Sequence, residues 1–202
     1  GDGWIAPSGL MAVGSREYTE VAAAAYVAAA EGLGWGVALA QVKAAFGKAD
    51  AALPLKVAQT PLLKGVSQLF SALASADVKL GIVSSDVHQE VEAFVDYYKC
   101  KEIGWYCGAS DEHLPKTHPD FLNFACEALV VSPLATLVVG DSASDLALAQ
   151  QGSAGFVAML GGWSRLPVIE GVDTGELSQK AGREVSALKI ASIRSLQEVE
   201  VF

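Results

Sequence analysis

Polar side chains that can bind phosphate or a metal ion follow three apolar runs of the sequence. They are, in chain order, Ser84, Ser85, Lys116, Asp141 and Asp145. Runs such as "KLGIV" and "ATLVV" are typical of buried strands in a parallel sheet. Because the loops after such strands converge on one crevice, we expect these side chains to meet at the same edge of the sheet.

The first group follows "KLGIV". Asp86 and Gln89 have the spacing of a helix capping box, so the ordinary interpretation of Asp86 is a helix start. That interpretation leaves Ser84 unexplained. A hydroxyl beside backbone N–H groups in a crevice can donate to an anion, which makes Ser84 a candidate anion-binding residue.

The second group is a loop, "HLPKTHPDF", in which Lys116 stands between two prolines. A lone lysine in a loop is usually solvated, and this is its ordinary interpretation. His113 and His118 lack the i, i+4 helical spacing of a metal-binding pair, so both are expected at the surface.

The third group, "GDSASD", follows the cleanest buried strand. Ser142 and Asp145 predict a capping box at the start of a helix. Asp141 is a candidate oxygen ligand for Mg²⁺, which takes one or two protein carboxylates and completes its shell with water and substrate phosphate. Asp145, one turn further, would hold a metal-bound water or the lysine, and it can form the capping box at the same time.

Two kinds of pattern position these groups. Residues 1 to 58 are alanine-rich with helical periodicity, and Gly32, Gly34 and Gly36 predict a turn between two antiparallel helices. Residues 59 to 202 alternate helix and strand, which predicts a doubly wound α/β fold with a parallel sheet. The strand candidates are "KLGIVS", "IGWYCG", "ATLVVG", "GFVAML" and "ALKIASI", and residues 161 to 184 read as surface loop.

Composition restricts the classes of function. The chain has 202 residues, 51% of them hydrophobic, and 14 Lys and Arg against 23 Asp and Glu give a net charge of -9. This charge argues against a general affinity for nucleic acid or an anionic membrane.

Cys100, Cys107 and Cys126 are an odd number without C-x-x-C spacing, so we expect neither a disulfide framework nor a zinc site, and a reducing cytoplasm fits best. The stretch from Val21 is mostly alanine and glycine and contains Glu31, which favours a packed helical pair over a membrane span.

The order of the three groups resembles the haloacid dehalogenase superfamily, specifically its phosphatases with a helical cap, such as phosphoglycolate phosphatase-like and β-phosphoglucomutase-like enzymes. "PLLKGVSQLFSALASADVKLGIVSSD" resembles the approach to the family's second motif, "KTHPDF" the third and "VVGDSASDLALAQQGSAG" the fourth. The fourth is the most specific. The resemblance covers residues 61 to 201, and the helical pair before them is similar to the family's cap. Thr117 departs from the family, which has a proline directly after the lysine.

The resemblance implies a Mg²⁺-dependent phosphoric monoester hydrolase that acts on a small phosphorylated metabolite through an aspartyl-phosphate. Ser84, with Ser85, would bind the phosphoryl group and Lys116 would neutralise it, while Asp141 would bind Mg²⁺ with support from Asp145. Positioning and electrostatic stabilisation supply most of the catalysis in phosphoryl transfer.

The sequence does not identify the substrate. In the family the cap selects the substrate. Arg16 in the cap is a possible contact for a phosphate ester or a carboxylate, although we favour a surface role for it.

The family's first motif has no counterpart here. That motif is a D-x-D element at the end of the first strand, and Asp2 in "GDG" follows no strand and lacks the second aspartate. In the family this strand lies between those that end at Ser84 and at Asp141. Its absence would leave two rows of backbone groups unpaired, at about 1 to 3 kcal/mol for each group. We therefore expect these residues to be the C-terminal part of a longer protein and to be inactive alone.

Two functions other than a phosphatase share parts of this pattern. A degenerate relative would bind a phosphorylated ligand or a partner without turnover and would keep Ser84 and Lys116 as an anion cradle. A receiver-type signalling domain is disfavoured, because receivers place their aspartates before the lysine, whereas Lys116 precedes Asp141. The choice between phosphatase and phosphomutase, and the oligomeric state, stay open.

Overall fold

The computed structural model describes residues 6, 9–10, 14–53, 55–109, 114, 116–159 and 190–193. The expected loop over residues 161 to 184, and the positions of Asp2 and His113, lie outside these residues. None of the described helices is both long and apolar enough to cross a membrane. The division of the chain into a cap over residues 1 to 58 and a core beyond them stays a prediction.

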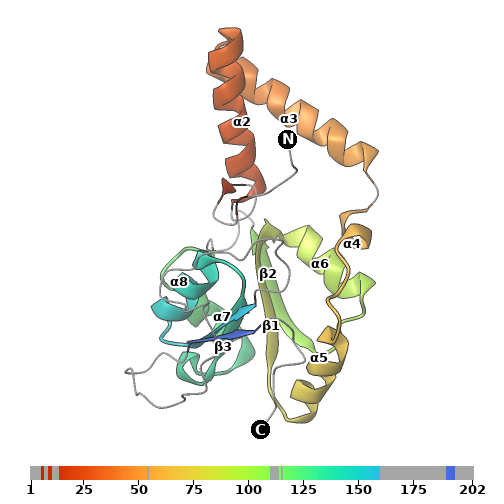
Figure 1. Ribbon diagram of the computed structural model, residues 1–202, viewed down its shortest axis with the longest axis vertical. Coiled ribbons are helices and arrows are strands. Elements are labelled where there is room, and N and C mark those ends of the chain that lie inside the picture. The colour runs from red at the N-terminus through yellow and green to blue at the C-terminus, as the bar shows by residue number, and fades with distance from the viewer. Residues whose placement is uncertain are drawn as a thin grey trace.

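Two helices, α2 (Arg16–Glu31) and α3 (Trp35–Ala52), form a hairpin that projects from the rest of the molecule (Figure 1). The glycine-rich turn between them is confirmed, since Gly32 ends α2 with a φ of 65°, a left-handed conformation that glycine adopts without strain. Gly36, expected in the turn, lies inside α3 instead. The turn is already complete at Gly34, which is the N-cap of α3.

The chain leaves the hairpin through the short helix α4 (Lys56–Gln59) and enters the core through α5 (Val66–Ser75). The expected alternation of helix and strand is confirmed from there on. Its elements are β1 (Leu80–Val87), α6 (His88–Tyr97), β2 (Ile103–Ala109), α7 (Phe121–Leu129), the 3₁₀ turn η1 (Pro133–Ala135), β3 (Leu137–Gly140), α8 (Ala143–Gln151), β4 (Gly155–Met159) and β5 (Ile190–Ile193). Each strand pairs with its neighbour in parallel, as the α/β fold class requires.

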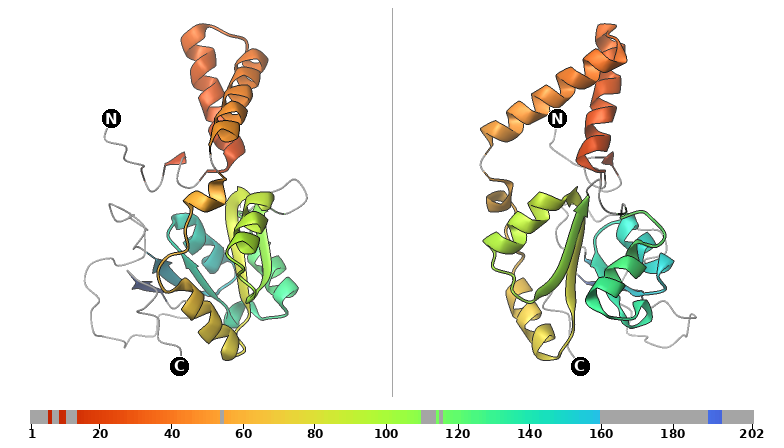
Figure 2. Two further views of the ribbon diagram at one scale, coloured as in Figure 1. Left: turned by 90° about the vertical axis from the view of Figure 1, so that its right-hand side faces the viewer. Right: turned by 180° about the vertical axis from the view of Figure 1, so that it is seen from behind.

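The described strands form two sheets and not one. Their orders are β1-β2 and β3-β4-β5, so that β1 and β3 each end a sheet. This is the place where the sequence predicted a missing central strand, between the strands that carry Ser84 and Asp141. On β3, Leu137 and Val139 are 54% and 50% exposed, while Val138 between them is buried. The two sheets lie beside each other with α5 and α6 outside β1 and β2 (Figure 2).

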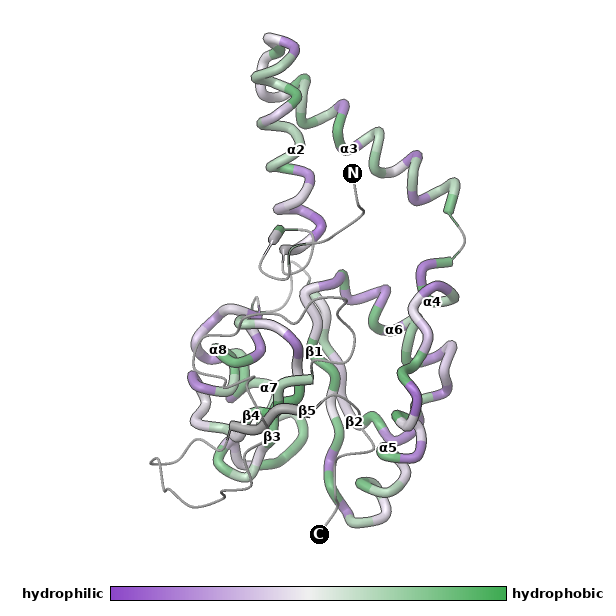
Figure 3. Tube along the Cα trace, in the orientation of Figure 1, coloured by the Kyte–Doolittle hydropathy of each residue, from purple (hydrophilic) through white to green (hydrophobic). Residues whose placement is uncertain are grey.

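A single hydrophobic core nevertheless connects the two sheets. Its residues come from β2, α7, β3, α8 and β4, and Val83 of β1 packs against them. The core is centred on Cys107, Phe121, Leu122, Leu148 and Phe156. Hydrophobic segments recur along α7 and α8, and also along the hairpin helices (Figure 3). The core thus packs residues of β2, β3 and β4 together with Val83 of β1.

Candidate functional site

The sharp turn after β3 is built around the carboxylate of Asp145. Ser142 caps α8, and the capping box that the sequence predicted is confirmed. Asp145 Oδ2 accepts hydrogen bonds from the backbone N of Asp141 at 3.1 Å, the backbone N of Ser142 at 3.0 Å and Ser142 Oγ at 2.6 Å. The turn is therefore held by a side chain from the first turn of the following helix.

The second oxygen of the same carboxylate, Oδ1, receives Lys116. Lys116 Nζ forms an ion pair with it, and the two side chains are only 11% and 9% exposed. The interpretation of Lys116 as a solvated loop lysine is wrong, since a charge buried to this degree needs a partner. Lys116 precedes α7, so residues 29 positions apart in the chain meet at the end of β3.

Gly140 makes this arrangement possible. A Cβ added at Gly140 would overlap the carboxyl group and the Cβ of Asp145. Only glycine therefore allows the Asp145 side chain to lie against the end of β3. The sequence contained this signal, a glycine directly before Asp141, although the spacing alone did not predict the contact.

Part of the N-terminus of α8 already has partners within the chain. The backbone N–H groups of Asp141 and Ser142 donate to Asp145, and those of Asp145 and Leu146 donate to Ser142. Open helix N-termini bind phosphate through such groups. These four donors are therefore taken up by the chain, and Lys116 is the charged donor that lies beside them.

Asp141 is the carboxylate best suited to a metal ion. It is partly buried and directly follows β3. In the part of the chain that the structure describes, no group of three or more His, Cys, Asp or Glu side chains could hold a metal by itself. Mg²⁺ keeps several water or phosphate ligands, so one or two carboxylates such as Asp141 could hold it. Both oxygens of Asp145 already accept bonds from the chain, which favours the lysine-holding role that the sequence left open for it.

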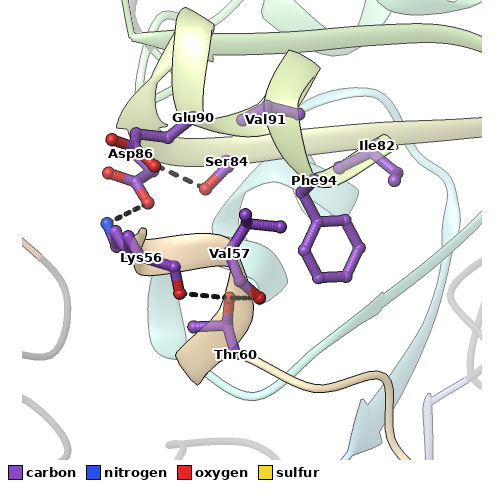
Figure 4. Close-up of a pocket in the computed structure, with 9 residues that line it drawn as sticks. All are labelled: Lys56, Val57, Thr60, Ile82, Ser84, Asp86, Glu90, Val91 and Phe94. Atoms are coloured by element: carbon purple, nitrogen blue, oxygen red, sulfur yellow. Dashed lines mark hydrogen bonds and ion pairs between the residues drawn. The ribbon is translucent and has the colours of Figure 1, made fainter. Parts of the chain in front are cut away.

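Ser84 belongs to a second group of residues, at the end of β1 (Figure 4). Its Oγ accepts a hydrogen bond from the backbone N of Asp86 at 3.1 Å. Asp86 Oδ1 accepts from Val87 N at 3.1 Å, and its Oδ2 forms an ion pair with Lys56 of α4. The prediction that Asp86 caps a helix is wrong. β1 continues to Val87, which is itself the N-cap of α6 and makes no side-chain cap bond.

A pocket of about 230 Å³ lies between α4, β1 and α6. Its lining residues are Lys56, Val57, Thr60, Ile82, Ser84, Asp86, Glu90, Val91 and Phe94, and Ser85 is not one of them. Ile82, Ser84 and Asp86 alternate along β1 and share the face that the pocket occupies. The role of Lys56 was missed from the sequence, because a single lysine just after a proline in a mostly apolar stretch carries no motif.

The structure thus brings Lys116, Asp141 and Asp145 together at the end of β3 and assigns Ser84 to a group at the end of β1. Each of these two strands lies at an edge of its sheet. The residues singled out from the sequence therefore form two groups, one at the end of β3 and one at the end of β1.

Arg16 is engaged inside the hairpin. Its guanidinium binds Glu20 at 2.7 Å and Asp50 at 2.6 Å, and it lies over the ring of Phe46 at 4.5 Å. The hydrogen bond from Arg16 lowers the pKa of the Asp50 carboxyl below its ordinary value. Arg16 therefore joins the start of α2 to the end of α3, an interaction that the surface role favoured from the sequence did not include.

The three cysteines are free and buried. Burial raises the pKa of the Cys100 and Cys107 thiols above their ordinary value. Thiols of this kind remain neutral and are poor nucleophiles. All three cysteines contribute to the apolar interior.

Comparison with known proteins adds a family and a fold. A family model described as haloacid dehalogenase-like hydrolase matches residues 10–152. No curated protein gave a match. A predicted phosphoglycolate phosphatase from Haemophilus somnus is 16% identical with a TM-score of 0.56, and the match covers 77% of this chain and 66% of that one.

Two further solved structures are similar. CbbY from Rhodobacter sphaeroides, crystallised with phosphate, is 16% identical with a TM-score of 0.54, over 79% of this chain and 65% of that one. A putative haloacid dehalogenase-like hydrolase from Bacteroides fragilis is 19% identical with a TM-score of 0.53, over 68% and 65%. The chain therefore spans no more than about two thirds of the length of these three proteins.

Proposed function

The chain belongs to the haloacid dehalogenase-like hydrolases, and from this premise we propose that it forms most of a Mg²⁺-dependent phosphatase. Its substrate is a small phosphorylated metabolite, and the reaction passes through an aspartyl-phosphate. The enzyme acts in the cytoplasm, a proposal that the three free, buried thiols support.

One observation carries the proposal: the buried ion pair of Lys116 with Asp145, directly beside Asp141. Lys116 neutralises negative charge on the transferring phosphoryl group. Asp145 holds the ammonium group in place, and Asp141 binds Mg²⁺. When bound, Mg²⁺ supplies positive charge to the phosphoryl oxygens and orients them.

The hydroxyl of Ser84 is proposed to donate a hydrogen bond to the phosphoryl group, with Ser85 beside it. A serine hydroxyl has one donor hydrogen and two acceptor sites. Because Ser84 Oγ accepts from the backbone N of Asp86, its own hydrogen can be donated to an anion.

The charge of the carboxylates supports the proposed role of a divalent cation. A bound Mg²⁺ would add positive charge beside Asp141 and Asp145 and would favour the approach of a dianionic phosphate. Phosphate binding should therefore depend on Mg²⁺.

The nucleophile is proposed to lie in a strand outside these 202 residues, because the sequence contains no D-x-D element. The two separate sheets support this proposal, since β1 and β3 both present a strand edge where such a strand would pair. It follows that the 202-residue chain is inactive by itself, since the covalent intermediate needs the absent carboxylate.

Calorimetric titration of the chain with inorganic phosphate tests the binding half of the proposal. We expect binding with Mg²⁺ and none without it. Lys116→Met should weaken binding by about tenfold or more, the loss of one charge-assisted hydrogen bond. The matched control is Lys79→Met, which removes an exposed lysine paired with Asp77 and should leave the affinity unchanged. Equal affinity without Mg²⁺, or in Lys116→Met, would contradict the assignment.

The alternative is a relative that binds a phosphorylated ligand or a partner without turnover. The absence of a D-x-D element from the sequence favours it, and the retained carboxylate of Asp141 argues against it. Mg²⁺-dependent phosphate binding without hydrolysis, in the protein extended by its upstream coding sequence, would support this alternative.

A further inference from the structure

We propose that Lys56 is a positioning residue that fixes the cap hairpin relative to the core and orients Ser84 through Asp86. The orientation of Ser84 matters for phosphate only if Ser84 binds it, so this part rests on the proposed function. The other part, the coupling of the hairpin to β1, is argued from the contacts of Lys56 and does not depend on the proposed function.

Two consecutive polar contacts join Lys56, Asp86 and Ser84 along one side of the pocket (Figure 4). Lys56 forms an ion pair with Asp86 Oδ2, and the two side chains are 52% and 34% exposed. Asp86 N donates to Ser84 Oγ at 3.1 Å. A displacement of Lys56 therefore acts first on Asp86 and then on the hydroxyl of Ser84.

The backbone around Asp86 is able to transmit such a displacement. The pairing of β1 with β2 is irregular between Val83 and Val87, so Ser84 and Asp86 lie in a segment without regular register. Asp86 Oδ1 also accepts from Val87 N at 3.1 Å. The carboxylate that binds Lys56 thus also shapes the end of the strand.

Two polar contacts join α4 to the elements on the other side of the pocket. α4 has four residues, of which only Val57 is buried. Apart from the ion pair, a hydrogen bond from Tyr98 Oη to the carbonyl of Val57 at 3.1 Å ties it to the end of α6. The 230 Å³ pocket separates the rest of α4 from β1 and α6. These polar contacts therefore act on the position of α4 beside the pocket, together with the buried side chain of Val57.

These contacts matter because α4 connects the hairpin to the core. α4 follows the end of α3 by a few residues and is the described connection from the hairpin to the core (Figure 1). Most exposed ion pairs contribute little to stability. This one joins the connecting segment α4 to β1 of the core, so its loss should change the orientation of the hairpin relative to the core more than the stability of either.

Distance measurement between the two units tests the proposal in the full 202-residue chain. Spin labels are attached at Tyr26→Cys on α2 and Leu134→Cys in η1, both strongly exposed positions. The three native cysteines are buried and stay unlabelled. Pulsed electron paramagnetic resonance then gives the distribution of distances between hairpin and core.

We expect one narrow distribution in the labelled parent protein and loss of that narrow peak in Lys56→Met and in Asp86→Asn. Lys56→Arg should restore the narrow peak, because arginine keeps the charge and the reach. Lys79→Met, which breaks an exposed lysine–aspartate pair away from the connecting segment, is the matched control and should match the parent. An unchanged distribution in Lys56→Met would overturn the proposal.

Phosphate titration in Mg²⁺ separates this proposal from the proposed function. Lys56→Met should weaken phosphate binding by about fivefold, the lower end of typical coupling between sites, with rescue by Lys56→Arg. If the distances change while phosphate affinity does not, the coupling to Ser84 is wrong. If the parent protein binds no phosphate, the proposed function fails, and the distance distributions alone decide whether Lys56 fixes the hairpin.

Discussion

Lys116 and Asp145 form a buried ion pair at the end of β3, where Asp145 also accepts three hydrogen bonds from the turn that contains Asp141. One carboxylate therefore fixes both the ammonium group and the turn before α8. This double role explains why the lysine and the aspartates occur together although a loop, a helix and a strand separate them in the chain. Substitution of Asp145 should therefore disturb both Lys116 and the turn that contains Asp141.

Breaking the pair from one side should be costly. We expect Lys116→Met or Asp145→Asn to lower the free energy of unfolding by about 3 to 5 kcal/mol, because each leaves a buried group without its partner. Urea denaturation measures this change. Lys79→Met, which breaks an exposed pair, should cost less than about 1 kcal/mol. Similar small losses at both lysines would show that Lys116 is solvated.

Substitution of Gly140 tests the close approach of Asp145 to β3. Gly140→Ala should destabilise the protein by about 1 to 3 kcal/mol, since its Cβ would overlap the Asp145 carboxyl group. Gly47→Ala is the matched control, because a Cβ at this position of α3 has open space around it. That change should stabilise the helix by up to about 1 kcal/mol. A neutral Gly140→Ala would mean that the turn can be rebuilt.

The hairpin should lose an interaction in acid. Arg16 lowers the pKa of Asp50 below its ordinary value of 3.8, so the ion pair stabilises the folded state above that pH and is lost as the pH falls through the folded-state pKa. We therefore expect Asp50→Asn to be less stable than the wild type at neutral pH and equal to it in strong acid. Urea denaturation over this pH range measures the difference. A difference that is independent of pH would contradict the ion pair.

The cysteines should resist alkylation. Burial raises the pKa of the Cys100 and Cys107 thiols, so very little thiolate is present at neutral pH and reagents have little access. Mass spectrometry after iodoacetamide treatment should find these residues unmodified in the native protein and modified in urea. Tyr26→Cys, at a strongly exposed position, provides a reactive control. Rapid native labelling of Cys107 would indicate that the core opens.

Local patterns predicted much of the fold. Apolar runs marked all five strands that the structure describes, and the serine and aspartate of "GDSASD" marked the capping box that Ser142 and Asp145 form. These features depend on neighbouring residues, which a sequence displays directly. The end of β1 was misjudged for the same reason. Asp86 has the spacing of a cap, but its carboxylate binds Lys56, which lies 30 positions earlier in the chain.

Contacts between residues far apart in the chain could not be predicted from the sequence. Nothing near Lys116 indicates that it is buried, because its partner belongs to a helix that begins after another strand. Nothing near Arg16 indicates Asp50, which lies 34 positions away. Such pairs exist only once the chain is folded. The order of the residues therefore indicated candidates for the site, whereas it did not indicate which of them contact one another.

The central claim is that a carboxylate from outside these residues completes a phosphoryl-transfer site around Lys116 and Asp141. It is tested most directly by hydrolysis of p-nitrophenyl phosphate in Mg²⁺, by the 202-residue chain and by the protein extended through its upstream coding sequence. We predict hydrolysis by the extended protein, its loss in Asp141→Ala and no hydrolysis by the shorter chain. Hydrolysis by the shorter chain that Asp141→Ala abolishes, or an in-frame stop codon immediately before Gly1, would contradict the claim.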